Sequence, residues 1–183
     1  MVDELMSLDI NILFCIGGDG TLRGAMAIAK EIAERNLQIS VIGIPKTIDN
    51  DINFVEKTFG FETAVQIATQ VISSAHAEAE GAENGIGIVK LMGRDSGFIA
   101  ATATLANSVV DFCLIPESRF SLKGSSGLIE SLAIKIKEKK HAVVVVAEGA
   151  GQELFGEESA KKYSSENVIK KDTGGLICEE IKD

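Results

Sequence analysis

The sequence predicts an α/β fold with a mainly parallel sheet and helices on both of its faces. Short apolar runs alternate with segments whose apolar residues recur at helical spacing, which is the pattern of βαβ units. The runs are apolar at almost every position, as expected of strands that are buried on both faces. The 183 residues are enough for one domain, or for one and a half small ones.

The expected strands and helices follow one another in alternation. Pro45 is expected to end the second strand, and Ser125 or Ser126 to cap the fourth helix. From Gly149 onward, Gly, Ser, Glu and Lys dominate and predict a loop or a mobile segment before a last short helix. The expected strands cover residues 10–16, 37–44, 86–91, 109–115 and 142–147, and the expected helices cover 22–36, 60–79, 96–106, 125–139 and 174–182.

The composition argues against several classes of function. The formal net charge is −9, which disfavours non-specific nucleic-acid binding. No apolar run approaches the ~18 residues of a membrane-spanning helix, and residues 1–9 lack the basic residues of a signal peptide. Cys15, Cys113 and Cys178 lack paired spacing, which indicates reduced thiols. We therefore expect a cytoplasmic protein with no membrane partner and no nucleic-acid partner.

Charged side chains follow the expected strands at their carboxyl ends. Asp19, Asp49, Arg94, Glu117 and Glu148 come after the first to the fifth strand, in that order. In open parallel sheets, ligands bind outside the carboxyl ends of the strands. The pattern therefore predicts a ligand site at that edge.

The run GGDGT at residues 17–21 has the composition of a phosphate-binding loop. Glycines let backbone N–H groups approach phosphate oxygens, and the helix expected from Leu22 points its positive end to the same place. Asp19 is the only carboxylate there, and beside a polyphosphate it would have to hold a Mg²⁺ ion. The alternative is a tight turn in which Asp19 caps the helix.

The run PKTIDND at residues 45–51 combines a cation, a hydroxyl and two carboxylates. One carboxylate, Asp49 or Asp51, could accept a proton from a substrate hydroxyl, and the other could help to place a metal or hold Thr47. Lys46 could neutralise phosphate charge. The alternatives are an acidic surface turn and a solvated lysine.

Two further strand ends carry residues suited to a sugar phosphate. Arg94, after Gly93, could bind a phosphate through its planar guanidinium, and Glu148 could accept hydrogen bonds from sugar hydroxyls. The alternatives are an Arg94 paired with Asp95 or Glu117, and a Glu148 in a solvated turn.

Together these motifs resemble the 6-phosphofructokinase family, whose order they follow along residues 8–155. TIDND is highly specific, whereas GGDGT alone is also similar to NAD kinases and diacylglycerol kinases. The resemblance implies transfer of a phosphoryl group from MgATP to the 1-hydroxyl of fructose 6-phosphate, a glycolytic step, in an allosteric homo-oligomer (dimer or tetramer). The other motifs are FGFETA at residues 59–64, MGR at 92–94 and AEG at 147–149.

The resemblance also implies residue roles. Asp49 corresponds to the base that takes the proton from the sugar hydroxyl, and Asp19, supported by Asp51, corresponds to the Mg²⁺ site. The implied donor-binding residues are Gly18, Asp19, Gly20, Thr21 and Lys46, and the implied sugar-phosphate-binding residues are Thr47, Ile48, Asp49, Met92, Gly93, Arg94 and Glu148.

Two positions bear on the phosphoryl donor. Pyrophosphate-dependent relatives carry Asp where this chain has Gly20, and an added carboxylate would repel the α-phosphate region of ATP. Lys46 is a feature of the pyrophosphate enzymes and points the other way. A steric and like-charge block at Gly20 would decide more than one flexible ammonium at Lys46. The resemblance therefore favours the ATP-dependent branch of plants and trypanosomes, and a pyrophosphate-dependent enzyme is the alternative.

The chain resembles an internal fragment of the family. Residues 1–84 are expected to form part of the phosphoryl-donor lobe and residues 85–183 most of the fructose 6-phosphate lobe. The family's first strand and nucleotide loop are expected upstream, and further sugar-phosphate contacts downstream. A non-catalytic fragment or regulatory subunit is the remaining alternative.

Overall fold

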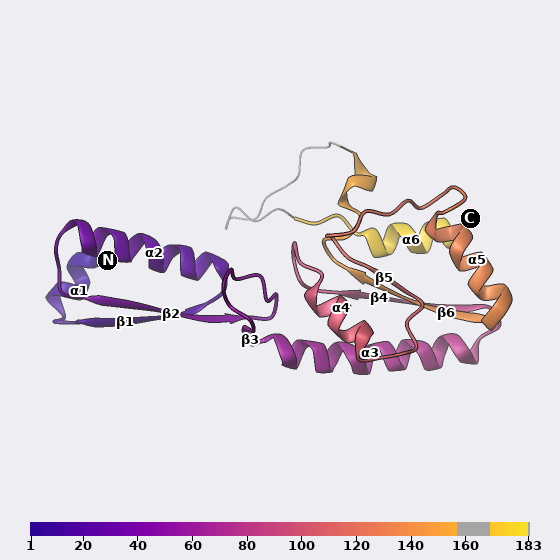
Figure 1. Cartoon of the computed structure of the whole chain (residues 1–183), viewed down its shortest axis with the longest axis horizontal. Helices are drawn as coiled ribbons and strands as arrows, with labels where there is room; N and C mark the ends of the chain where they lie inside the picture. The colour runs from indigo at the N-terminus through magenta and orange to yellow at the C-terminus, as the bar shows by residue number, and fades with distance from the viewer. Residues whose placement is uncertain (157–168, 183) are drawn as a thin grey trace. The chain divides into compact units, whose positions relative to one another are not determined.

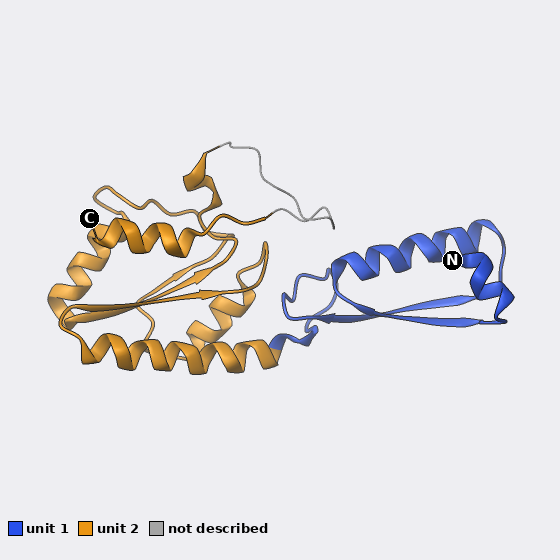
Figure 2. Cartoon of the chain, turned by 180° about the vertical axis from the view of Figure 1, so that it is seen from behind, with its two compact units in different colours: residues 1–61 blue, residues 62–183 orange. Residues whose placement is uncertain are grey.

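The computed structural model describes residues 1–156 and 169–182, and the chain forms two compact units, residues 1–61 and 62–183 (Figures 1 and 2). In the first unit the strands form one sheet in the order β1-β2-β3. Its elements are α1 (Val2–Ser7), β1 (Ile12–Gly17), α2 (Asp19–Glu34), β2 (Ser40–Thr47) and β3 (Phe59–Gly60).

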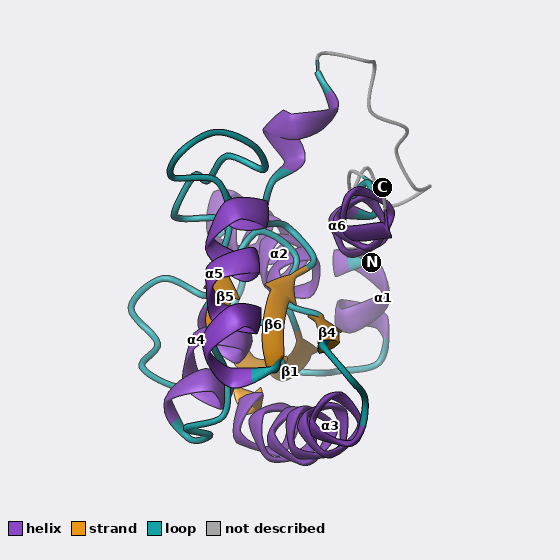
Figure 3. Ribbon diagram, turned by 90° about the vertical axis from the view of Figure 1, so that its right-hand side faces the viewer, coloured by secondary structure: helices purple, strands orange, loops and turns teal. Residues whose placement is uncertain are grey.

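The second unit contains a separate sheet in the order β4-β6-β5. Helices α3 and α4 lie on one face of this sheet, and α5 and α6 on the other (Figures 1 and 3). Its elements are α3 (Phe61–Gly81), β4 (Gly85–Leu91), α4 (Phe98–Leu105), β5 (Phe112–Leu114), α5 (Leu128–Lys139), β6 (His141–Ala147), the 3₁₀ helix η1 (Gln152–Phe155) and α6 (Thr173–Lys182).

The predicted α/β fold is confirmed, since every strand pair in both sheets is parallel. The core of the second unit is aliphatic. Residues 142–147 of the central strand β6 are buried, and Ile72, Leu132 and Ile177 from three helices pack there with almost no exposed surface. Burial on both faces explains why this strand is apolar at every one of these positions.

The prediction of helices on both faces holds for the second sheet but not for the first, which has a helix along only one of its faces. Helix α2 packs on that face, where Gly43 lies against Leu22. Within residues 1–61, all of which the structure describes, no helix covers the other face. The apolar side chains exposed on β1 and β2 are Ile12, Phe14, Ile16 and Ile42.

Several element boundaries differ from the sequence prediction for local reasons. Strand β2 runs through Pro45 to Thr47, because its pairing changes at that point from β1 to β3. Helix α5 begins at Leu128, after Gly127, because backbone carbonyls of residues 121 and 122 accept from its first N–H groups, so neither Ser125 nor Ser126 caps it.

Strand β5 is shorter than the predicted strand at residues 109–115, because a side chain takes over part of the pairing. The carboxylate of Asp111 accepts from the N–H of Val143 at 3.1 Å and from the ammonium of Lys139 at 2.7 Å. Burial raises the pKa of Asp111, but Lys139 and the Val143 N–H outweigh it and hold that pKa below its ordinary value.

The compact units divide the chain between residues 61 and 62, so α3 falls mainly in the second unit. The division into a donor lobe at residues 1–84 and a sugar-phosphate lobe at 85–183 concerns function and stays a prediction. The loop predicted from Gly149 onward contains η1, and its residues 157–168 lie outside the described residues.

No helix among the described residues is long and apolar enough to cross a membrane. The three cysteines are half-buried free thiols, as predicted.

Close approach of α3 to β4 makes Gly87 a sensitive position. A Cβ atom there would lie 2.8 Å from the carbonyl oxygen of Ala75, whereas a Cβ at Gly81 would meet nothing within 4 Å. Gly87→Ala should therefore lower the free energy of unfolding by about 1–3 kcal/mol in urea denaturation. Gly81→Ala is the matched control and should be neutral or slightly stabilising. Equal stability of the two variants would contradict this packing.

Candidate functional site

Strands β1 and β2 bring two of the predicted loops to one edge of the first sheet. The strands pair in parallel from Ile12 opposite Ser40 to Gly17 opposite Pro45. The loop after Gly17 and the loop after Thr47 therefore leave the sheet side by side. They are in contact, because a Cβ atom at Gly18 would lie 3.3 Å from the Cβ of Thr47.

Helix α2 begins earlier than predicted, within the GGDGT run. Gly18 is its N-cap, and Asp19, Gly20 and Thr21 form its first turn. Asp19 is therefore not the helix cap, which was the alternative interpretation of this loop. The first N–H groups of a helix have no intrahelical acceptor, so this turn presents donors and the positive end of the helix dipole. A Cβ atom at Gly20 would meet nothing within 4 Å, so space lies open beside it.

Arg23, one turn further along α2, is a candidate site residue that the sequence did not single out. Its Nε lies 3.1 Å from Oδ1 of Asp19, and its Nη2 pairs with Oδ2. Asp19 raises the pKa of Arg23 most, and the charge of Asp51 also raises it. The spacing of four residues between Asp19 and Arg23 on an expected helix was the available signal.

Asp49 is held by a hydroxyl from the end of β2. Thr47 Oγ1 donates to Asp49 Oδ2 at 3.2 Å and accepts from the N–H of Asp49, also at 3.2 Å. The side chain of Asp49 is largely buried, with 9% of the residue exposed. These contacts fix the carboxylate at the edge where α2 begins, which an acidic surface turn would not do.

Asn50 closes the rest of this loop. It has a φ of +54°, which Asn tolerates better than most residues. Its Oδ1 accepts from the N–H of Thr58 at 2.9 Å, and its Nδ2 donates to the carbonyl of Glu56 at 3.3 Å. Of the other predicted residues here, Lys46 is exposed, and Ile48 and Asp51 are half-buried.

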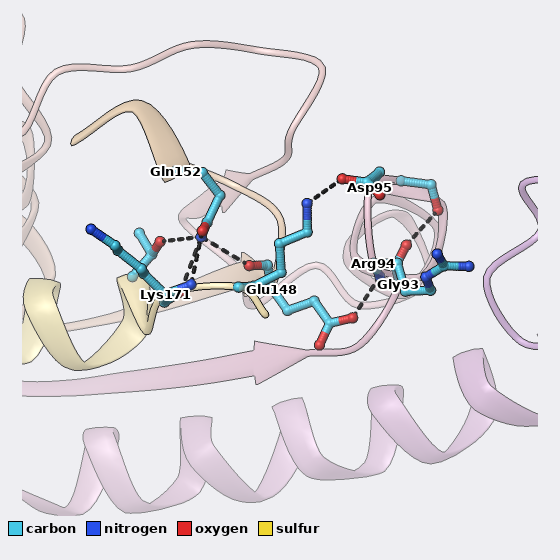
Figure 4. Close-up of polar contacts among 9 residues, drawn as sticks. Gly93, Arg94, Asp95, Glu148, Gln152 and Lys171 are labelled. Carbon is cyan, nitrogen blue, oxygen red and sulfur yellow. Dashed lines mark hydrogen bonds and ion pairs between the residues drawn. The ribbon is translucent and has the colours of Figure 1, made fainter. Parts of the chain in front are cut away.

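The second unit carries an analogous pair of strand ends. Strands β4 and β6 pair up to Leu91 opposite Ala147, and the N–H of Glu148 then donates to the carbonyl of Leu91 at 2.8 Å. The carboxylate oxygen Oε1 of Glu148 accepts from the N–H of Arg94 at 2.6 Å (Figure 4). Glu148 therefore does not lie in a solvated turn, and it determines the course of the MGR loop.

The MGR loop is tightly constrained. Gly93 has a φ of +144° and Arg94 a φ of +53°. A Cβ atom at Gly149 would lie 2.2 Å from the carbonyl oxygen of Arg94, so only glycine allows the two loops to come this close. Met92, in contrast, is exposed.

The candidate partners of Arg94 have other contacts. Asp95 pairs with Lys170, and Glu117 accepts from the N–H of Gly97 at 2.8 Å.

The structure thus gathers the predicted residues into two groups, one in each unit. The first sheet edge carries Gly18, Asp19, Gly20, Thr21, Lys46, Thr47, Ile48, Asp49 and Asp51, and the second carries Met92, Gly93, Arg94 and Glu148.

The carboxylates of the first unit suit one kind of metal site. Residues 1–156 and 169–182 contain no group of three or more His, Cys, Asp or Glu side chains arranged to hold an ion. Mg²⁺, however, is commonly bound through one or two carboxylates, with waters and substrate phosphates completing its shell. Asp19 and Asp51, which both act on Arg23, have the chemistry for that mode.

The parallel sheets and the glycine-rich helix start define an α/β protein with a loop typical of phosphate binding. The chain belongs to the phosphofructokinase family, since the family's profile, described as Phosphofructokinase, matches residues 1–181. The family resemblance predicted from the motifs is confirmed.

Individual relatives of the chain are also phosphofructokinases. The chain is 50% identical over 187 residues to the ATP-dependent 6-phosphofructokinase of Borreliella burgdorferi, covering 99% of this chain and 42% of that protein. It is 52% identical over 185 residues to ATP-dependent 6-phosphofructokinase 7 of Arabidopsis thaliana, covering all of this chain and 38% of that protein. A solved pyrophosphate-dependent phosphofructokinase from Marinobacter aquaeolei matches with a TM-score of 0.68 and 28% identity, over 81% of this chain and 39% of that one. The chain thus spans about two fifths of the length of the curated relatives.

The contact between Thr47 and Asp49 can be tested by itself. Thr47→Val keeps the shape of the side chain but removes the hydroxyl that bonds both the N–H and the carboxylate of Asp49. It should lower the free energy of unfolding by about 1–3 kcal/mol in urea denaturation, because partly buried polar groups lose their partner. Thr47→Ser keeps the hydroxyl and is the control. Unchanged stability of Thr47→Val would show that this contact does not hold the loop.

Proposed function

We propose that the complete protein containing this chain transfers the γ-phosphoryl group of MgATP to the 1-hydroxyl of fructose 6-phosphate, giving fructose 1,6-bisphosphate. The observation that carries this proposal is the position of Asp49, which Thr47 holds at the sheet edge where α2 begins. A base and a phosphate-binding helix start at one edge are what phosphoryl transfer to an alcohol requires.

In this proposal Asp49 accepts the proton of the sugar hydroxyl. The hydrogen bond from Thr47 orients Oδ2, and burial excludes most solvent from the carboxylate. A base that is held in one orientation loses little entropy when the substrate binds. Arg94 and Glu148 would bind the sugar phosphate, with Met92 and Gly93 shaping their loop.

The first turn of α2 would receive the donor phosphates. Gly18, Gly20 and Thr21 present backbone N–H groups there, and Lys46 adds a positive charge. Asp19 and Asp51 would hold Mg²⁺, which supplies neutralisation of phosphate charge when it is bound. The guanidinium of Arg23 then has phosphate oxygens as alternative partners to Asp19.

ATP is the proposed donor. The open space beside Gly20 supports this choice, as do the ATP-dependent names of relatives that are about 50% identical. Solved pyrophosphate-dependent neighbours keep pyrophosphate as the alternative. A homo-oligomer under allosteric control and a cytoplasmic location stay predictions, and two Arabidopsis relatives are named chloroplastic.

Asp49→Asn tests the base. The amide cannot accept the proton, so kcat in the complete protein should fall at least ~10²-fold while the KM values change little. Steady-state assays with ATP and fructose 6-phosphate measure both constants. Asp9→Asn, at an exposed position in the same unit, is the control. Near-normal kcat in Asp49→Asn would refute the assignment, and no turnover by the wild-type complete protein would favour a regulatory subunit.

Gly20→Asp tests the donor preference. The open space around Gly20 accepts the side chain without a clash, so the effect should fall on the donor rather than on the fold. The KM for ATP should rise about tenfold or more, because the added carboxylate repels the phosphates. Gly20→Asn has nearly the same volume and no charge, and it separates repulsion from crowding. An equal effect of both variants would rule out charge as the cause.

A further inference from the structure

The side chain of Gln152, in η1, joins three parts of the second unit. Its Nε2 lies 3.0 Å from the carbonyl of Lys171, 3.2 Å from Oγ1 of Thr173 and 3.3 Å from the carbonyl of Glu148. Its Oε1 accepts from the N–H of Lys171 at 2.9 Å (Figure 4). Both the nitrogen and the oxygen of this half-buried side-chain amide therefore form hydrogen bonds.

Residues 169–173, here called the return segment, are the partner of Gln152. Lys171 of this segment bonds Gln152 although the two residues are 19 positions apart in the chain. Lys170 pairs with Asp95, directly after Arg94 in the MGR loop. Asp172 pairs with Lys90 of β4 at 2.8 Å. The return segment thus spans the ends of β4 and β6.

Thr173 fixes the end of the return segment. The residue is buried, with 1% exposed, and its Oγ1 donates to the carbonyl of Ala150 at 2.7 Å. Ala150 and Glu148 belong to the same turn after β6. Gln152 and Thr173 therefore hold this turn from two directions.

The turn after β6 is what aims the carboxylate of Glu148. The N–H of Glu148 is fixed by Leu91, and its carbonyl is fixed by Gln152. With the main chain held on both sides, Oε1 reaches the N–H of Arg94 at 2.6 Å. Among the described residues, no hydrogen bond is made to Oε2 of Glu148, so that oxygen retains acceptor capacity for a sugar hydroxyl.

We propose that Gln152 is a positioning residue for the sugar-phosphate site: by holding the return segment against the turn after β6, it keeps Glu148 and Arg94 in the geometry that binds fructose 6-phosphate. The identity of the ligand rests on the proposed function, whereas the role of Gln152 in placing Glu148 and Arg94 does not. In this proposal Gln152 acts through Glu148 and Arg94 and makes no contact of its own with the substrate.

The test compares Gln152→Met with wild type in the complete protein. Methionine keeps the length of the side chain but has neither the donors nor the acceptor. Calorimetric titration with fructose 6-phosphate, without donor, should give a dissociation constant raised about tenfold, because the site geometry is no longer held. The KM for fructose 6-phosphate should rise in parallel, and the KM for ATP should stay within about twofold. Glu153→Gln, exposed and adjacent, is the control.

A second variant separates loss of positioning from a general loss of protein stability. Thr173→Val removes the hydroxyl contacts from the other side of the return segment, and it should weaken fructose 6-phosphate binding in the same way. Unchanged sugar-phosphate affinity in both variants, with or without a lower melting temperature, would reduce Gln152 to a purely structural role and overturn the proposal.

Hydrogen exchange of the Arg94 amide separates this proposal from the proposed function. Without any ligand, exchange at Arg94 should be at least about fivefold faster in Gln152→Met than in wild type, because its acceptor Glu148 is less well placed. Unchanged exchange overturns the positioning role. Faster exchange in Gln152→Met, together with a wild-type protein that does not bind fructose 6-phosphate, would support the positioning part and refute the proposed substrate.

Discussion

The parallel, in-register pairing of β1 with β2 is the constraint on which the first site depends. Because Gly17 lies opposite Pro45, the glycine-rich start of α2 and the TIDND loop leave the sheet at one edge and touch through Gly18 and Thr47. A shift of the pairing by a single residue would send alternate side chains to the opposite face and separate the two loops. The chemistry proposed for Asp49 therefore follows from strand register before it follows from any single side chain.

In the second unit, close approach of two backbone segments brings the corresponding loops together. Strands β4 and β6 end opposite each other, and glycine at position 149 lets the turn after β6 lie directly against Arg94. The carboxylate of Glu148 then has a structural task, since it binds the N–H of Arg94. A residue that shapes its neighbour's loop and retains one acceptor oxygen can link the folding of the loop to recognition of a ligand.

Much of this arrangement could be predicted from the sequence, because buried parallel strands leave long apolar runs such as residues 142–147. Ligands bind outside the carboxyl ends of the strands in such sheets, and this tendency indicated the candidate residues. Contacts made by side chains to distant backbone were not predictable: Asp111 shortens β5, and Gln152 holds a segment far along the chain. Neither has a periodicity or a motif. Arg23 was predictable in principle, from its helical spacing to Asp19.

The most direct test of the central claim is a crystal structure of the complete protein with fructose 6-phosphate and a non-hydrolysable MgATP analogue. The account predicts the sugar 1-hydroxyl within about 3 Å of a carboxylate oxygen of Asp49, with the donor phosphates over the first turn of α2. A sugar bound away from Asp49, or phosphates bound away from Gly18 and Gly20, would contradict it.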